Sequence, residues 1–217
     1  MDKKNILILL GGYWHDFDGF AAAMTPLLEG AGHRVRASYD FEDLTRLEAQ
    51  GIDLLLSHTC LSEPPAGKTP SCPAGFSSAQ VTALSEWVRR GGALLASHAA
   101  TVPGESGPEL ERLLGGAFLR HPPQRAFQVL PLSAPHPITD GIGAFKVFDE
   151  LYIERYHPTV AIHMVAAYEG TAHPVVWSRT EGRGRVAHLA PGHSERVWKL
   201  EPYRRLMLQT VRWLLER

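Results

Sequence analysis

The sequence predicts an α/β fold of three layers, in which a mostly parallel β-sheet lies between helices. Two observations lead to this prediction. Short, continuous apolar runs, typical of strands buried on both faces, recur along the first half of the chain. Between these runs, apolar residues recur at the spacing of an amphipathic helix. Alternation of the two patterns is typical of consecutive βαβ units, whose strands pair in parallel.

The strands of the first half are short in this prediction. They cover residues 5–10, 33–38, 52–57 and 93–97. A helix is expected over 17–28, where Phe20, Met24 and Leu28 share one face. Because Pro26 removes a backbone donor and its ring clashes with the preceding turn, we expect a kink or an early end there.

A second helix is expected over residues 78–90. Ser77, followed three positions later by Gln80, has the pattern of a capping box. Gly91-Gly92 marks the end of the helix and leads directly into the fourth predicted strand.

The second half of the chain has a different pattern, with short strands separated by proline and glycine turns. The predicted strands are 124–130, 147–156, 160–168, 174–180 and 184–190. Such spacing indicates that the sheet gains antiparallel strands at one edge. An amphipathic helix over 202–216 completes the core. Residues 60–77 form a long loop rich in Pro, Gly and Ser, which is typical of a lid or binding element.

Composition limits the classes of function. The 217 residues are 44% hydrophobic and 21% charged, which predicts one soluble domain over 1–217. With 22 basic and 23 acidic residues, the chain has no field that would attract nucleic acid or an anionic membrane. No segment reaches the roughly 18 apolar residues of a membrane helix, and no signal peptide is recognisable. Two cysteines, Cys60 and Cys72, indicate a reducing cytoplasm rather than a disulfide framework.

Polar side chains follow several of the predicted strands, at the edge where open parallel sheets bind ligands. They are His15, Asp16, His58, His98, His121, Glu150, His193 and Glu195. Eleven histidines are many for a chain of this length, and their gathering at one rim favours a functional site. We treat the other six as structural or solvated: His33, His136, His157, His163, His173 and His188.

His98 is the most informative of these residues. It follows a glycine turn and a short apolar strand, in the run GGALLASHAA over 91–100, and a sharp turn after such a strand exposes a side chain at the crevice. In class I glutamine amidotransferases a similar segment ends in the nucleophilic cysteine. The thiol is therefore replaced by an imidazole, and glutamine hydrolysis is not expected, although His193 and Glu195 match the His-x-Glu of that triad.

Five segments in the same order resemble the ThuA-like (trehalose utilisation) family, which has a class I glutamine amidotransferase-like fold related to the flavodoxin-like fold. They are LGGYWHDF at 10–17, WVRRGGALLASHAA at 87–100, LLGGAFLRHPP at 113–123, HPITDGIGAFKVFDELY at 136–152 and GRGRVAHLAPGHSERVW at 182–198. The resemblance covers nearly the whole chain. It implies a role in carbohydrate metabolism and a site built from His15, His98, His121, Glu150 and His193.

Two mechanisms use this set of residues. In one, His15, His98 and His193 hold a single divalent metal, with zinc as the first candidate, and the metal activates water. In the other, no metal is bound; His98 and His193 act as general acid and base, and Glu150 or Glu195 fixes a tautomer.

Aromatic and histidine side chains near these positions are candidates for substrate binding. They are Trp14, His15, His121, Tyr152 and Trp198. Aromatic faces stack on the apolar faces of sugar rings, but packing at the rim explains the same residues equally well. Arg120 and Arg196 are interpreted as solvated rather than as anion ligands.

The sequence therefore predicts an enzyme that performs hydrolysis or a related acid/base step on a sugar or keto-sugar derivative, with His98, His193 and Glu150 as catalytic residues. A non-catalytic module that binds a sugar or a partner is the alternative. A third reading, cysteine-dependent hydrolysis, requires that Cys60 titrates well below its normal value. A homodimer is compatible with the sequence.

Overall fold

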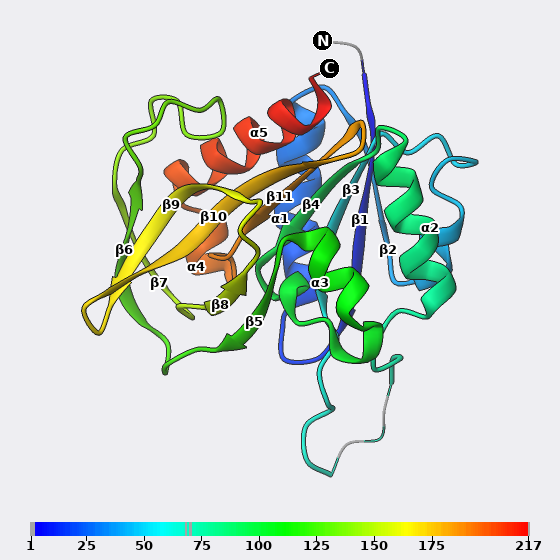
Figure 1. The fold of residues 1–217 in the computed structure, drawn as a ribbon, viewed down its shortest axis with the longest axis horizontal. Coiled ribbons are helices and arrows are strands. Elements are labelled where there is room, and N and C mark those ends of the chain that lie inside the picture. The colour runs from blue at the N-terminus through cyan, green and yellow to red at the C-terminus, as the bar shows by residue number, and fades with distance from the viewer. Residues whose placement is uncertain (1–2, 68, 70, 217) are drawn as a thin grey trace.

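The computed structural model describes residues 3–67, 69 and 71–216 and has the predicted α/β architecture (Figure 1). Five strands form its parallel half: β2 (Arg34–Ser38), β1 (Asn5–Gly12), β3 (Leu54–Cys60), β4 (Ala93–Ser97) and β11 (Gly184–Leu189). Four antiparallel strands extend the same sheet: β10 (Thr171–Glu181), β9 (Ala161–Tyr168), β6 (Arg125–Pro131) and β7 (Phe145–Asp149). The antiparallel edge is therefore confirmed.

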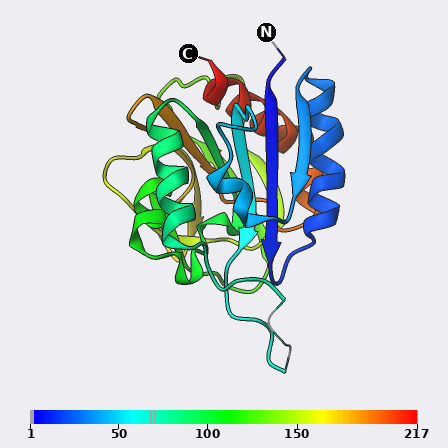
Figure 2. The same cartoon turned by 90° about the vertical axis from the view of Figure 1, so that its right-hand side faces the viewer.

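Helices cover both faces of this sheet, which gives the three predicted layers. They are α1 (Phe17–Gly30), α2 (Ser78–Arg89), α3 (Pro108–Leu114), α4 (Glu195–Trp198) and α5 (Glu201–Leu215). Figure 2 shows α1 and α2 on opposite faces. Buried residues of α1 and α5 pack on one face with Ile6 and Ile8, and those of α2 and α3 pack on the other with Leu7 and Leu9. The continuous apolar run of β1 thus supplies both cores.

Two short strands form a separate antiparallel pair, β5 (Gly116–Arg120) with β8 (Ile153–Tyr156). The prediction of one strand over 147–156 is therefore wrong: β7 ends at Asp149 and β8 begins at Ile153. The three residues between them leave the sheet directly after Asp149, whose carboxylate accepts hydrogen bonds from the backbone of the loop at Gly192 and His193. Strand β5 was not among the predicted strands.

The first helix does not end at Pro26 but continues to Gly30. Pro26 lies on the exposed face, whereas Leu27 and Leu28, which follow it, are buried in the core. Packing of these two side chains outweighs the single backbone hydrogen bond that proline removes. The capping box of α2 is confirmed, since Ser77 and Gln80 each accept a hydrogen bond from the other's backbone N–H.

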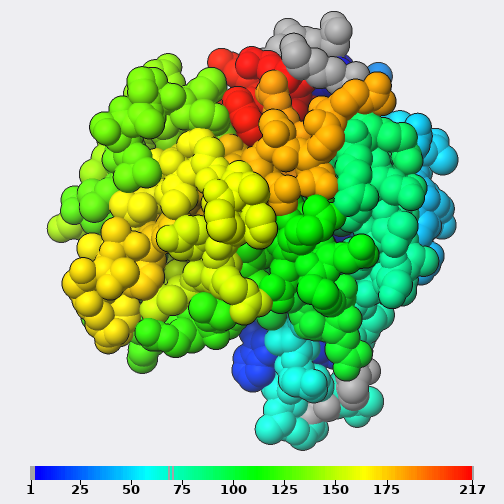
Figure 3. Space-filling view, viewed as in Figure 1, coloured from blue at the N-terminus to red at the C-terminus, as the bar shows by residue number. Residues whose placement is uncertain are grey.

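Three short 3₁₀ helices complete the chain: η1 (Phe41–Thr45), η2 (His98–Thr101) and η3 (Gly104–Ser106). The described part of the loop between β3 and α2 projects beyond the carboxyl edge of the parallel strands, as Figure 3 shows in space-filling form. None of the helices of the described chain is long and apolar enough to cross a membrane.

Candidate functional site

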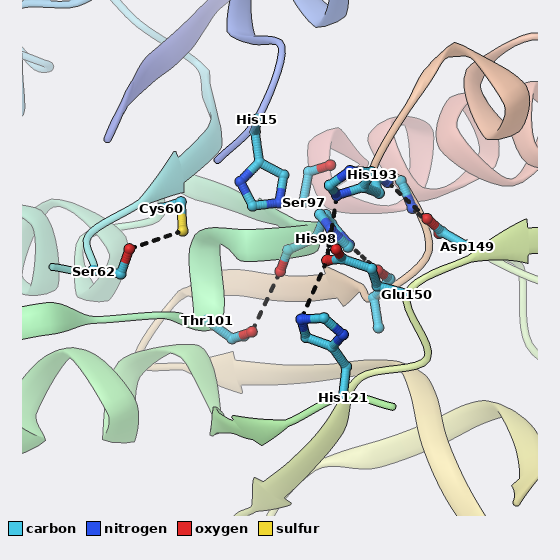
Figure 4. Close-up of polar contacts among 12 residues, drawn as sticks. His15, Cys60, Ser62, Ser97, His98, Thr101, His121, Asp149, Glu150 and His193 are labelled. Atoms are coloured by element: carbon cyan, nitrogen blue, oxygen red, sulfur yellow. Dashed lines mark hydrogen bonds and ion pairs between the residues drawn. The ribbon is translucent and has the colours of Figure 1, made fainter. Parts of the chain in front are cut away.

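Four of the predicted site residues meet beyond the ends of the central strands (Figure 4). His15 follows β1, His98 follows β4 directly, Glu150 follows β7, and His193 lies between β11 and α4. One nitrogen or carboxylate oxygen from each of the four lies within 4.8 Å of the others. Segments that are distant in the sequence thus converge on a volume large enough for one ion.

The hydrogen bonds of His98 and His15 fix the tautomer of each ring. His98 Nδ1 lies 2.6 Å from the carbonyl oxygen of Ala190, and His15 Nδ1 lies 3.0 Å from that of Tyr13. Because a carbonyl oxygen only accepts, both Nδ1 atoms carry a proton, and in the neutral form of each ring Nε2 presents a lone pair. These two Nε2 atoms are buried and have no hydrogen-bond partner among the described residues.

Glu150 lies at the centre of the site. Its Oε2 is 3.2 Å from His193 Nδ1, 3.5 Å from His98 Nε2 and 3.8 Å from His121 Nε2. Burial opposes ionisation of Glu150, but the facing rings of His193 and His98 hold its pKa well below the usual range. The same Glu150 carboxylate raises the pKa of His193. Burial, reinforced by the neighbouring His98, lowers the pKa of His15 to about 3.

The backbone at His98 adopts a conformation that side chains other than glycine rarely take. Its φ is 49°, in the left-handed region, at the turn from β4 into η2. Gly192 approaches this turn closely: a Cβ atom there would lie 3.1 Å from the Tyr203 hydroxyl and 3.4 Å from His98 Cβ. The turn directs the imidazole toward Glu150, but the side chain is fully buried, whereas the sequence predicted that it is exposed at the crevice.

The loop that carries His193 is held by Asp149, which the sequence analysis did not single out. The Asp149 carboxylate is buried and accepts hydrogen bonds from the backbone N–H groups of Gly192, at 2.7 Å, and His193, at 3.2 Å. Asp149 lies beside Glu150 in the sequence, so a single strand end positions a carboxylate of the site and anchors a histidine.

Comparison with known proteins identifies the family of the chain. The family model ThuA, described as trehalose utilisation, matches residues 5–214. The chain belongs to the ThuA family. A comparison with curated proteins gave no match.

Solved structures that resemble the chain in fold include a ThuA-like protein, a cytoplasmic protein and a β-galactosidase. A ThuA-like protein from Parabacteroides merdae ATCC 43184 has a TM-score of 0.81 at 17% identity, over 99% of this chain and 90% of that one. The cytoplasmic protein STM1381 from Salmonella typhimurium LT2 has a TM-score of 0.69 at 13% identity, over 97% of this chain and 100% of that one. A β-galactosidase from Rahnella sp. R3 has a TM-score of 0.67 at 12% identity, over 100% of this chain but 32% of that one. At these identities the likeness shows the fold alone.

The aromatic candidates of this ThuA-family chain differ in their positions. Tyr152 stacks on His98 with ring centroids 4.3 Å apart and is 2% exposed, and His121 stacks on its other side at 5.7 Å. Trp198 is buried, and its indole N–H donates to the carbonyl oxygen of Gly192. Trp14, at 61% exposure, is the one of these candidates that presents its ring to solvent.

The position of Glu195 differs from the amidotransferase pattern. Its side chain points outward and pairs with Lys199 at 2.6 Å, so it does not reach the histidines. Glu150, which comes from another strand, is the carboxylate beside His193. The match of His193 and Glu195 to His-x-Glu is therefore local in sequence only.

Cys60 is not set up as a nucleophile in this ThuA-family protein. Burial raises the pKa of its thiol to about 11, the opposite of what cysteine-dependent hydrolysis requires. The thiol lies 3.7 Å from the Ser62 hydroxyl, and neither Cys60 nor Cys72 is in a disulfide. This finding corrects the third reading of the sequence.

His58 lies next to the site without joining it. Its ring stacks flat on Phe20, with centroids 3.7 Å apart, and burial holds its pKa well below the usual value.

The site itself is nearly closed: the side chains of Glu150 and His193 are 12% and 19% exposed, and His121, at 35%, forms the open side. A cleft of about 680 Å³ lies elsewhere, lined mainly by α5 with Pro137, Asp140 and Leu27.

Proposed function

We propose that this ThuA-family protein is a metal-dependent enzyme that acts on a sugar or keto-sugar derivative by hydrolysis or a related acid/base step. The ligands in this proposal are His15, His98, His193 and Glu150, and zinc is the first candidate for the ion. When bound, a divalent ion of this class polarises a substrate oxygen or lowers the pKa of a bound water.

One observation carries the proposal: His15 Nε2 and His98 Nε2, both buried and without a hydrogen-bond partner in the described chain, lie beside a carboxylate that already contacts His193 Nδ1 at 3.2 Å. Leaving such atoms unpaired costs about 1–3 kcal/mol each, so a missing partner is expected between them. Metal-bound histidines characteristically donate their other ring N–H to a carbonyl, as His98 and His15 do here. Nitrogen and oxygen ligands of one tetrahedral zinc ion are about 3.4 Å apart, so this cluster, whose atoms lie within 4.8 Å of one another, would contract around the ion.

The protein's own residues have separate roles in this proposal. The carbonyls of Ala190 and Tyr13 hold the lone pairs of two rings toward the ion. His121, whose Nδ1 donates to the carbonyl of Pro122, lies on the open side of the site with its Nε2 3.8 Å from Glu150 Oε2, so a substrate would enter past this ring. The sugar class rests on the family description, trehalose utilisation. We also place the protein in the cytoplasm, on the grounds of its free cysteines.

The first test is metal content by mass spectrometry on protein purified without an affinity tag. Wild type is expected to hold near-stoichiometric zinc, manganese or iron, and His98→Ala to lose it while keeping its fold by circular dichroism. His163→Ala is the matched control, because His163 is a buried histidine on β9 that pairs with Ser178. Absence of metal from wild type, even after each ion is added back, would overturn the metal site.

The second test is turnover. Keto-sugars and disaccharides are incubated with wild type and His98→Ala, and products are followed by mass spectrometry. Turnover by wild type that disappears in His98→Ala supports the proposal, whereas retained turnover in the variant contradicts it. Calorimetric binding of a sugar with no chemical change would support the non-catalytic binding module instead.

A further inference from the structure

A second polar cluster, buried behind the histidine site, is not used by the proposed function. It consists of Thr101, Glu154 and His188, together with the carbonyl of Ala96. His188 Nδ1 lies 3.1 Å from the Ala96 oxygen, and its Nε2 lies 3.1 Å from Glu154 Oε2. The other carboxylate oxygen of Glu154 lies 2.5 Å from the Thr101 hydroxyl.

Every member of this cluster is satisfied although none reaches solvent. The side chains of His188 and Glu154 are 0% and 1% exposed, and Thr101 is fully buried. Because the Ala96 carbonyl only accepts, His188 Nδ1 carries a proton, and a second proton lies between Nε2 and the carboxyl group of Glu154. A buried pair of this kind adds little net stability compared with an apolar packing of the same volume. Its presence is therefore better explained by a positional role.

The position of the cluster indicates what it holds. Ala96 precedes His98 by two residues, and Thr101 ends the helix η2 that His98 begins. Glu154 lies on the short strand β8, four residues after Glu150. The cluster thus connects the two chain segments that bring His98 and Glu150 together. These segments belong to different sheets, and β8 pairs only with β5 among the described strands.

We infer that Glu154, held by His188 and Thr101, is a positioning residue for the metal site. It fixes β8 against η2 at the separation that places Glu150 Oε2 3.5 Å from His98 Nε2. It also keeps Tyr152, two residues before Glu154, stacked on the His98 ring. This inference rests on the proposed function, because it assigns the cluster to the geometry of that site.

The experiment uses Thr101→Val and Glu154→Gln, with Thr101→Ser as the conservative rescue. Thr101→Val removes the hydroxyl and leaves a Glu154 oxygen unpaired, whereas Thr101→Ser keeps the donor. Zinc affinity, the visible absorption spectrum of the cobalt-substituted protein and thermal unfolding are measured for each. Ser178→Ala is the matched control, since it removes a buried hydrogen bond, between Ser178 on β10 and His163 on β9, that involves no member of this cluster.

Thr101→Val and Glu154→Gln are expected to lose about 10–100-fold in zinc affinity and to change the cobalt spectrum, as partners of metal ligands do. Thr101→Ser should return both to wild-type values, and Ser178→Ala should lower stability alone. The inference is overturned if Thr101→Val unfolds at a lower temperature yet binds zinc and cobalt as wild type does. Should Glu154→Gln fail to fold, the comparison of Thr101→Val with Thr101→Ser decides.

Failure of the proposed function would give a different experimental result. If wild type binds no metal at all, that function fails, and the positioning role is then judged from a crystal structure of Thr101→Val. A longer separation between His98 Nε2 and Glu150 Oε2 than 3.5 Å supports the role, and an unchanged separation overturns it.

Discussion

Three structural constraints act together on His98. Its backbone is left-handed, its Nδ1 is committed to the Ala190 carbonyl, and its Nε2 is buried without a described partner. The first constraint directs the ring into the crevice, and the second leaves one lone pair facing Glu150. A cysteine thiol at this position would be a nucleophile; the imidazole here is a ligand or a base.

Cys60→Ser is expected to leave metal content and turnover within about twofold of wild type. The reason is that burial raises the pKa of the thiol to about 11, so almost no thiolate is present near neutral pH. Turnover and metal content of the purified variant check this, with His98→Ala as the inactive reference. An inactive but folded Cys60→Ser protein would contradict it and restore cysteine-dependent hydrolysis.

At the scale of elements, buried carboxylates connect segments that are distant in the sequence. Asp149, the last residue of β7, accepts hydrogen bonds from the backbone N–H groups of Gly192 and His193. Asp43, within η1, connects this helix to β2 and to the following turn, because its buried carboxylate accepts from Arg36 at 3.0 Å and from Gln50 at 2.7 Å. Neither carboxylate could be assigned a partner from periodicity, which reports only which face of an element is apolar.

Asp43 is expected to make stability fall in acid. Burial opposes its ionisation, but hydrogen bonds from Arg36 and Gln50 hold its pKa at about 2, below the 3.8 of a free aspartate. A depressed pKa contributes stability above the unfolded value and loses it as pH falls toward the folded value, so the loss occurs between about pH 4 and 2. The contribution is about 1–2 kcal/mol, since Arg36 is half exposed.

Urea unfolding at pH 6 and at pH 2.5 tests this expectation. Asp43→Asn should be less stable than wild type at pH 6 and show a smaller change between the two pH values. The exposed Asp140→Asn serves as the control. Equal pH dependence in wild type and Asp43→Asn would contradict the assignment.

On the scale of the whole molecule, the sheet carries two apolar cores and one polar edge. Each face buries its own cluster, and the described ligand candidates come from the ends of β1, β4, β7 and β11. Only the folded chain assembles such a set, so an ion bound there stabilises the folded state alone. The fold is shared with ThuA-like structures and with part of a β-galactosidase, which is why the fold by itself assigns no reaction.

Metal removal is expected to lower the thermal midpoint of unfolding. At a free ion concentration about 1,000 times the dissociation constant, binding contributes about 4 kcal/mol, which corresponds to roughly 8–16 °C for a chain of this size. Scanning calorimetry of chelator-treated protein, before and after zinc is restored, measures the shift. His98→Ala should show no shift on zinc addition, and a midpoint of wild type that ignores both chelator and zinc would argue against the site.

The sequence by itself determined the layered α/β architecture, the parallel pairing of the first strands, the antiparallel edge and the family. Apolar periodicity is a local property, and it identifies strands such as β1 and helices such as α2 without tertiary information. It also placed His15, His98 and His193 after strands, and parallel strands end at one edge.

The tertiary structure alone decided the break after Asp149, the continuation of α1 past Pro26, the outward position of Glu195 and the burial of Trp198. It also decided the tautomers of the site histidines and the cluster of Glu154 with His188. These features depend on contacts between residues that lie far apart in the sequence, such as Asp149 with Gly192 or His98 with Ala190. A buried polar atom needs a hydrogen-bond partner, and that partner is often distant in the sequence. Local apolar periodicity does not indicate which residue it is.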